Sequence, residues 1–284
     1  MLLHVTGKVC EPSGKVNEDI AGSTKTAAWV MDGATGLGDE KLLPGESDAA
    51  WLVQRVDAFL RAHADDASLG MAELFAGAIE DVQMAYERSK LRAAQARYEL
   101  PSAGVVFVRC TPSCIEYARL GDCTGVFALG SAMVSMGRSR LHSLDEQVLD
   151  KMRALQREGM QDYARLRRAI RDDLRAHRNL TNVVGGYWVL GIEPEAACHM
   201  ETRAIPLERP ATALLMSDGF YRAVDTFHVI AEDRILACAM DQGLATILAA
   251  VRRLEAGDAE CIRYPRFKPQ DDATALLFEM RAHR

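Results

Sequence analysis

The sequence predicts an α+β fold in which antiparallel strands form the core and helices cover them. Four short apolar segments separated by tight turns, a pattern typical of an antiparallel meander, lie at 104–110, 114–122, 124–129 and 132–136. Two long amphipathic segments precede them, at 47–63 and 71–97. Because such helices bury only one face, two of them in succession predict a helical layer packed across a sheet.

Acidic residues stand at the ends of several predicted strands. The apolar run AAWVM stops on Asp32, ATALLM is followed by Asp218, and CIEYARL is followed by Asp122, whereas Asp271 and Asp272 precede the final run ATALLF. In an antiparallel sheet, an acid before one strand lies at the same edge as an acid after its neighbour. Carboxylates gathered in this way need a neutralising partner, and oxygen ligands suit Mg2+ or Mn2+.

The segment NED supplies two further acids, Glu18 and Asp19. A hairpin from a strand near 3–9 or 19–22 to the strand at 27–31 brings one of them toward the same edge. Two interpretations stay open here, a polar loop or part of the acidic cluster. The same holds for Asp122, which fits either the cluster or a turn aspartate that caps its own loop.

The remaining helices and strands are predicted from the spacing of apolar residues and from the residues that interrupt it. Ser47 is a suitable N-cap for the helix at 47–63, whose apolar residues recur every three or four positions. The segment 199–205 alternates as a strand. Two more helices are predicted, near 226–240 and 243–255.

A helical, basic segment occupies about 142–180. From Lys151 to Arg178 it holds nine Lys or Arg against four Asp or Glu, a local charge of +5, which leaves −11 for the rest of a chain whose net charge is −6. The segment is either a solvated helical face or a cationic flap that attracts a phosphorylated substrate to an acidic site. The net negative charge argues against a general nucleic-acid binder.

Composition also bears on location and redox state. The chain has 284 residues, 49% of them apolar, which fits one large domain. Its start lacks the apolar core of a signal peptide, and no apolar run is long enough to cross a membrane, so we expect a cytoplasmic protein without a membrane partner. The seven cysteines are scattered and lack metal-site spacing, which predicts reduced thiols in or near the core.

Taken in order, these motifs resemble the signature of the metal-dependent Ser/Thr protein phosphatases, the PPM or type 2C family, in a bacterial-type member. The matching motifs are Asn17-Glu18-Asp19, Asp32-Gly33, Gly121-Asp122, Ser217-Asp218-Gly219 and Asp271-Asp272-Ala273-Thr274. The resemblance spans nearly the whole chain. It implies a four-layer αββα sandwich, two antiparallel sheets flanked by helices, and a single domain over 1–284 into which the segment at about 142–180 is inserted as a flap.

The resemblance also implies a site for two Mn2+ or Mg2+ ions. The implied metal ligands are Glu18, Asp19, Asp32, the carbonyl of Gly33, Asp218 and Asp271. Asp32 is expected to bridge both ions, and Asp32 and Asp218 to act in catalysis through the metal-bound water. Asp122 matches the acid that helps to hold a third, weaker ion in bacterial members.

The activity implied is hydrolysis of phosphoserine and phosphothreonine in proteins, a signalling function. Two ions lower the pKa of a shared water so that a metal-bridging hydroxide attacks phosphorus directly. No covalent phosphoenzyme is needed, so none of the cysteines has to be a nucleophile.

Three departures from the family pattern stand out. Gly14 occupies the place of the arginine that usually holds the substrate phosphate, and Lys15 beside it is our candidate replacement. Ala34 follows Asp32-Gly33 where many members have histidine or Met-Gly-Gly. The Gly-Asp-Cys-Thr segment and the loop 181–191 also differ from the common form. Two alternatives therefore remain: a pseudophosphatase that acts as a binding module, and a hydrolase of small phosphate esters.

Overall fold

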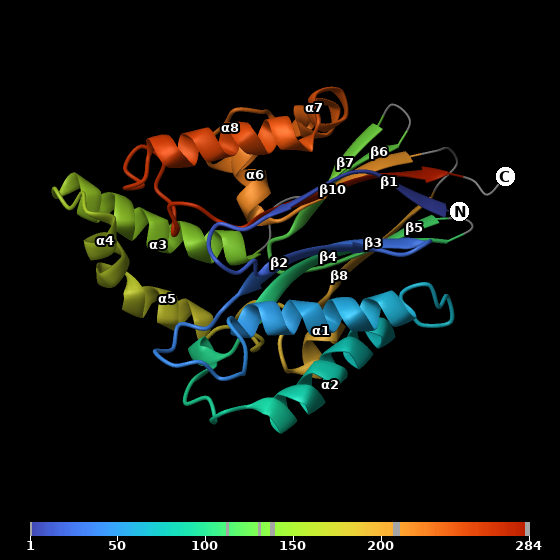
Figure 1. Cartoon of the computed structure of the whole chain (residues 1–284), viewed down its shortest axis with the longest axis horizontal. Coiled ribbons are helices and arrows are strands. Elements are labelled where there is room, and N and C mark those ends of the chain that lie inside the picture. The colour runs from blue at the N-terminus through green and yellow to red at the C-terminus, as the bar shows by residue number, and fades with distance from the viewer. Residues whose placement is uncertain (1, 112–113, 130–131, 137–139, 207–210, 282–284) are drawn as a thin grey trace.

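Two five-stranded antiparallel sheets pack face to face, with helices on both outer faces (Figure 1). The structure, a computed structural model, describes residues 2–111, 114–129, 132–136, 140–206 and 211–281. In order across it, the first sheet contains β1 (Leu2–Glu11), β10 (Ala273–Arg281), β9 (Ala211–Met216), β6 (Thr124–Leu129) and β7 (Ala132–Ser135). The second contains β2 (Asp19–Ser23), β3 (Ala27–Ala34), β4 (Ser102–Cys110), β5 (Cys114–Leu120) and β8 (Glu201–Pro206).

The helices form two covering layers and a third group at one end. The second sheet is covered by α1 (Asp48–His63) and α2 (Met71–Ser89), and the first by α6 (Asp218–Asp225), α7 (Ile235–Gln242) and α8 (Leu244–Gly257). The four-layer αββα sandwich is therefore confirmed. Short 3-10 turns lie at Arg97–Glu99, Pro194–His199 and Glu232–Arg234.

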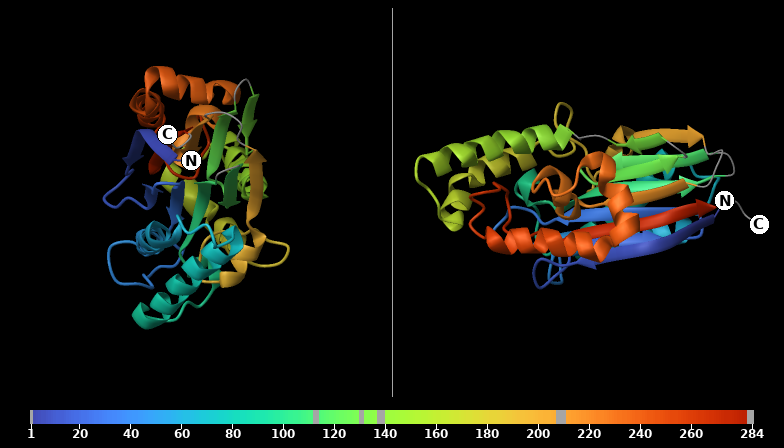
Figure 2. Two further views of the ribbon diagram at one scale, coloured as in Figure 1. Left: turned by 90° about the vertical axis from the view of Figure 1, so that its right-hand side faces the viewer. Right: turned by 90° about the horizontal axis from the view of Figure 1, so that it is seen from above.

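Three further helices lie beyond one end of the sheets, as Figure 2 shows most clearly. They are α3 (Arg140–Arg157), α4 (Tyr163–Ala169) and α5 (Arg171–Arg178), and we call them the flap. The flap has a small core of its own, in which Met152, Leu166 and Ile170 contact Phe267 and Cys261 of the segment before β10. The basic segment predicted to be helical is thus helical, and it packs against the segment before β10.

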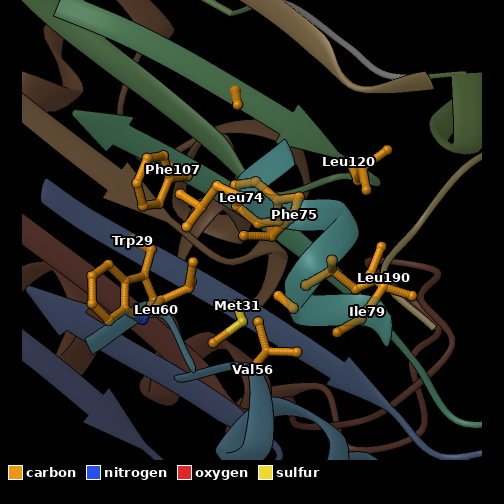
Figure 3. Close-up of a cluster of buried hydrophobic side chains, with 14 of the residues drawn as sticks. Trp29, Met31, Val56, Leu60, Leu74, Phe75, Ile79, Phe107, Leu120 and Leu190 are labelled. Atoms are coloured by element: carbon orange, nitrogen blue, oxygen red, sulfur yellow. The ribbon is translucent and has the colours of Figure 1, made fainter. Parts of the chain in front are cut away.

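Strand β3 shows why an uninterrupted apolar run lies at the centre of the fold. Trp29 and Met31 face α1 and α2, in the cluster of Figure 3, whereas Ala28 and Val30 face the other sheet. Both faces of the strand are buried, so both sets of alternating positions are apolar. β3 is held from both sides by β2 and β4, and this fixes where its last residues emerge.

Two helix predictions were wrong in their limits. The second helix ends at Ser89 rather than continuing toward Arg97, because Lys90 leaves the helical conformation and the Leu91 N–H pairs with the carbonyl of Leu42. The helix expected near 226–240 is replaced by α6, which starts directly after β9, and by the separate α7. Within the described residues no single helix could span a membrane, although the bent pair Glu232–Gln242 and Leu244–Gly257 passes on length and composition.

Candidate active site

The two strands of the first hairpin bring the first two motifs together. β2 and β3 are antiparallel, and their register places Asp19 directly opposite Asp32. The N–H of Gly33 donates to the carbonyl of Glu18 over 3.1 Å, and a Cβ at position 33 would lie 2.4 Å from that carbonyl oxygen. Glycine is therefore required at position 33, and the predicted meeting of NED with Asp32 is observed.

The buried carboxylate of Asp19 accepts no hydrogen bond from the residues that the structure describes. Its residue is 4% exposed, and neither carboxylate oxygen has a hydrogen-bond partner among the residues described. Burial raises the pKa of Asp19 to about 8, the nearby Asp218 adds to this rise, and the hydroxyls of Ser217 and Thr274 lie close enough to oppose it. An unsatisfied buried carboxylate of this kind is suited to a cation.

Asp32 and Asp218 approach each other from different sheets. Asp218 is the first residue of α6, and its N–H lies 3.4 Å from Oδ2 of Asp32. Burial and then the charge of Asp218 raise the pKa of Asp32 well above its ordinary range. Burial also acts to raise the pKa of Asp218, but the hydrogen bond with Asp32 and the charge of Arg222 lower it overall. The pair thus favours the protonated form at Asp32 and the ionised form at Asp218.

Asp122 completes the group of acids at strand ends. It follows β5, and glycine at position 104 of the neighbouring strand makes room for it, because a Cβ there would lie 2.7 Å from Oδ1 of Asp122. Burial, followed by the charge of Asp218, raises the pKa of Asp122 to about 7. We call the group Asp19, Asp32, Asp122, Asp218 and Asp271 the acidic end of the sandwich.

Asp271, unlike the other acids, already has cationic partners. Its Oδ2 pairs with Arg222 over 2.7 Å and its Oδ1 with Lys268 over 2.6 Å. Arg222 also pairs with the buried Glu255. Burial outweighs these cations, so the pKa of Asp271 is still raised. The structure thus brings Asp271 to the acidic end as predicted, but with its charge offset.

The two remaining acids of the motifs, Glu18 and Asp272, accept hydrogen bonds from hydroxyls and from backbone N–H groups. Glu18 accepts hydrogen bonds from the hydroxyls of Thr35 (2.5 Å) and Ser47. Asp272 accepts from the N–H groups of Ser13 and Glu18, both at 2.6 Å, and from the Ser13 hydroxyl. Asp272 therefore fixes the loop that leads into β2, a positioning function that the sequence did not reveal.

Lys15 lies apart from these groups. Its ammonium pairs with Glu46 at 3.0 Å, and its side chain is 87% exposed. It does not line the cavity described next. The structure does not bring Lys15 to the acids, and its contact with a phosphate stays a prediction.

A cavity of about 580 Å3 separates the acidic end from the flap. Asp32, Asp122, Asp218 and Asp271 line one side. The flap residues that line the other side include Asp145, Arg153, Arg167, His177 and Arg178. From the sequence, the arginines of 151–178, Arg167 among them, were candidates for contact with the substrate only as part of a basic flap. The cavity is large enough for a phosphorylated side chain.

Asp145 is the acid that sequence reasoning missed. It lies on α3, and burial, followed by the charges of Asp122 and Asp218, raises its pKa to about 8. Leu141, Asp145 and Leu149 all line the cavity, and their spacing of four residues places them on one face of the helix. That spacing was the available signal, but the sequence does not show which face meets the acids.

The flap is fastened to the loop that follows Asp32. Arg178 donates through Nη1 to the hydroxyl of Ser102 at 2.7 Å and to the carbonyl of Ala34 at 3.3 Å. Arg175 donates to the carbonyl of Leu37 at 3.0 Å, and both Arg171 and Arg175 pair with the exposed Asp39. Part of the positive charge of the flap therefore pairs with groups of the sandwich and holds the flap in place.

The acidic end fits divalent cations by its donor chemistry. All its side-chain donors are carboxylate oxygens, one carboxylate is unpaired, and burial raises the pKa of several others. In the described part of the chain, no three His, Cys, Asp or Glu side chains already stand in a metal-holding arrangement. Ions bound here would take the place of the protons that burial favours on these carboxylates.

Comparisons with known proteins agree with this chemistry. The profile of the family described as protein phosphatase 2C matches residues 6–251. The chain is similar in structure to the serine/threonine phosphatase PstP/Ppp of Mycobacterium tuberculosis, with 14% identity over 99% of this chain and 100% of that one and a TM-score of 0.58. It is similarly related to the serine/threonine phosphatase Stp1 of Staphylococcus aureus, with 13% identity, 99% and 96% coverage and a TM-score of 0.56.

A third structure is that of the catalytic domain of PstP in complex with two manganese ions. It shares 14% identity over 98% of this chain and 97% of that one, with a TM-score of 0.54. At such identities the likeness is one of fold. No curated protein matches the chain significantly.

Proposed function

Because the chain belongs to the protein phosphatase 2C family and is a metal-dependent protein serine/threonine phosphatase, we propose that its active site is the acidic end of the sandwich beneath the flap. The observation that carries this assignment is the convergence of Asp19, Asp32 and Asp218 from three strand ends. The substrate is a phosphoprotein, and its phosphorylated serine or threonine enters the cavity between the acids and the flap.

We propose that two divalent ions bind here, with a third, weaker ion near Asp122. The proposed ligands of the two ions are Glu18, Asp19, Asp32, the carbonyl of Gly33, Asp218 and Asp271. The central position of Asp32 supports a bridging role, since Asp19 lies opposite it in the sheet and the first N–H of α6 points at it. Oxygen donors suit Mn2+ or Mg2+, and Mn2+ is the ion to test first because PstP has been seen with manganese.

When bound, such ions lower the pKa of a shared water and offset charge on the phosphoryl oxygens. The protein's own residues prepare the site. Thr35 and Ser47 orient the carboxylate of Glu18, and Arg222 and Lys268 hold Asp271 in place. Ala34 has no ionisable group, so the position after Asp32-Gly33 supplies no proton to the leaving group.

The test is Mn2+-dependent phosphate release from phosphothreonine peptides and from p-nitrophenyl phosphate, compared with the same protein in EDTA. Release from both substrates only with metal is expected. Failure of the wild-type protein to hydrolyse either substrate would support the pseudophosphatase, and hydrolysis of small esters without peptides would support the small-ester hydrolase. Neither alternative has an observation that favours it over the protein phosphatase.

The wider setting of the enzyme is also a proposal. We propose that 1–284 forms a single phosphatase domain with the flap inserted at about 142–180. A phosphoprotein substrate implies a protein kinase in the same compartment, so we assign the enzyme to signalling in the cytoplasm. Nucleic acid and membrane are not proposed as partners, because the chain is acidic overall.

A further inference from the structure

Besides any bound ions, a cationic side chain could bind a phosphate monoester in the cavity, but almost every Arg or Lys that lines it is already engaged. Arg153 pairs with Glu146 and Asp150, Arg222 with Glu255 and Asp271, Arg266 with Asp258, and Lys268 with Asp271. Arg178 donates to Ser102 and Ala34. Arg263 is exposed at the rim, with its guanidinium over the ring of Tyr264.

Arg167 is different. Its Nη1 is buried and has no hydrogen-bond partner among the residues that the structure describes. The pKa of Arg167 is lowered, chiefly because burial disfavours the charged guanidinium. The nearby charge of Arg178 also lowers this pKa, whereas Tyr163 and Asp271 act to raise it. A desolvated guanidinium without an acceptor is an incomplete ion pair, and an anion in the cavity would complete it.

The helix that carries Arg167 is held in a fixed position. Leu166, which precedes Arg167 on α4, and Ile170, which caps the C-terminal end of α4, are fully buried in the core of the flap. The hydroxyl of Tyr163 donates to the carbonyl of Phe267 at 2.6 Å, and Asp162 caps the helix. The guanidinium is therefore presented from a rigid element rather than from a loose surface.

The first segment of the chain offers no comparable group. Position 14, where the family usually has a phosphate-binding arginine, is glycine, and a Cβ there would meet no heavy atom within 4 Å. The neighbouring Lys15 is exposed and paired with Glu46. Positions 14 and 15 thus present no guanidinium to the cavity, whereas the flap does.

We propose that Arg167 binds the phosphate group of the substrate from the flap side of the cavity, in place of the missing arginine of the first segment. This inference rests on the proposed phosphatase function and adds the residue that recognises the phosphate. Arg167 lines the same cavity as Asp271 and Arg178, so a phosphate bound by it lies between the flap and the acidic end. The planar fork of a guanidinium matches two phosphate oxygens, which an ammonium cannot do.

The decisive experiment compares two adjacent arginines. Arg168 follows Arg167 on α4 but is exposed and does not line the cavity. Calorimetric titration of the Mn2+-loaded protein with inorganic phosphate measures binding without turnover. We expect Arg167→Ala to raise the Kd by about 10- to 100-fold, the range expected for a hydrogen bond to a charged group. Arg168→Ala should bind phosphate as the wild type does, and Arg167→Lys should fall between.

Kinetics supply a second readout. Arg167→Ala should raise the KM for p-nitrophenyl phosphate and for a phosphothreonine peptide by the same factor, because both share only the phosphate. Wild-type phosphate affinity in Arg167→Ala, or a larger effect from Lys15→Ala, overturns the inference. If the alanine variant does not fold, Arg167→Gln keeps most of the side chain without the charge and gives the same comparison. A wild-type protein inactive with Mn2+ would instead refute the proposed function.

Discussion

The backbone N–H of Asp218 lies 3.4 Å from Oδ2 of Asp32, and this contact joins the two sheets at the acidic end. Asp32 lies near the end of β3 in one sheet, and Asp218 begins the helix that follows β9 of the other. The positive end of a helix dipole therefore points at the carboxyl group of Asp32. An ion bound here would contact both sheets at once.

Asp32→Asn and Asp218→Asn should each lower Mn2+-dependent activity by about 100-fold or more, since changes even outside the immediate ligands typically cost 10- to 100-fold. Each substitution removes a carboxylate but keeps its shape, so circular dichroism should show the folded protein. The exposed Asp241 on α7 provides the matched control, and Asp241→Asn should be as active as the wild type. Near-normal activity in either active-site variant would contradict the assignment.

The metal-free protein should become less stable as the pH rises. Burial raises the pKa of Asp19 and of Asp145 to about 8, far above the values of an unfolded chain. The folded state therefore binds these protons more tightly, and its extra stability is present at low pH and is lost as the pH passes from about 4 to about 8. Urea unfolding in EDTA across this range measures the trend.

Mn2+ should reverse that dependence, because the ion binds the deprotonated carboxylates and its stabilising effect grows with pH. Asp19→Asn should flatten the curve measured in EDTA and reduce the stabilisation by Mn2+. A free energy of unfolding that rises with pH in EDTA would show that these carboxylates are ionised in the folded protein.

Much of this architecture could be predicted from local sequence. Apolar runs that stop on acids identified the strand ends, and the expected hairpin of β2 with β3 brings the NED segment to Asp32, with Asp19 directly opposite it. Helix α1 begins at its predicted cap, where the Ser47 hydroxyl accepts from the N–H of Ala50. Such features depend on neighbouring residues, which a sequence shows directly.

Contacts between distant segments could not be predicted in the same way. Arg222 reaches Asp271 only because α6 packs beside the segment before β10, and no spacing in the sequence links the two. Asp145 lies before the stretch from Lys151 to Arg178 whose charge stands out in the sequence, and only the fold shows that it lines the cavity. The different roles of Asp271 and Asp272 were hidden for a similar reason, since only the fold shows that Asp272 binds backbone N–H groups.

Asp272→Ala should destabilise the protein by about 1.5–3 kcal/mol, the range for hydrogen bonds to a charged group. The change leaves the N–H groups of Ser13 and Glu18 without their acceptor at the entrance to β2. Ser13→Ala removes only the hydroxyl contact and should cost less, about 0.5–1.5 kcal/mol. Urea unfolding of the metal-free protein gives both values, and equal stability of Asp272→Ala and wild type would exclude the positioning role.

The basic residues of α4 fall into two groups by their exposure, and we expect substitutions in the two groups to affect activity differently. Arg165 and Arg168 are exposed, whereas Arg167 lines the cavity. Reversing Arg165 and Arg168 to glutamate should lower kcat/KM for acidic phosphopeptides at low salt, because exposed charge attracts such substrates over long distances. The loss should shrink as salt is added, since screening acts over roughly 8 Å at physiological ionic strength.

Hydrolysis of p-nitrophenyl phosphate by the same double variant should barely change, because this small ester carries no acidic residues for the flap to attract. Steady-state kinetics on both substrates across a salt series separates the possibilities. An equal loss on both substrates at every salt concentration would mean that these arginines support the fold of the flap. No loss on either would mean that the outer face of α4 is a solvated helical surface, and that the flap acts on substrates only through the residues that line the cavity.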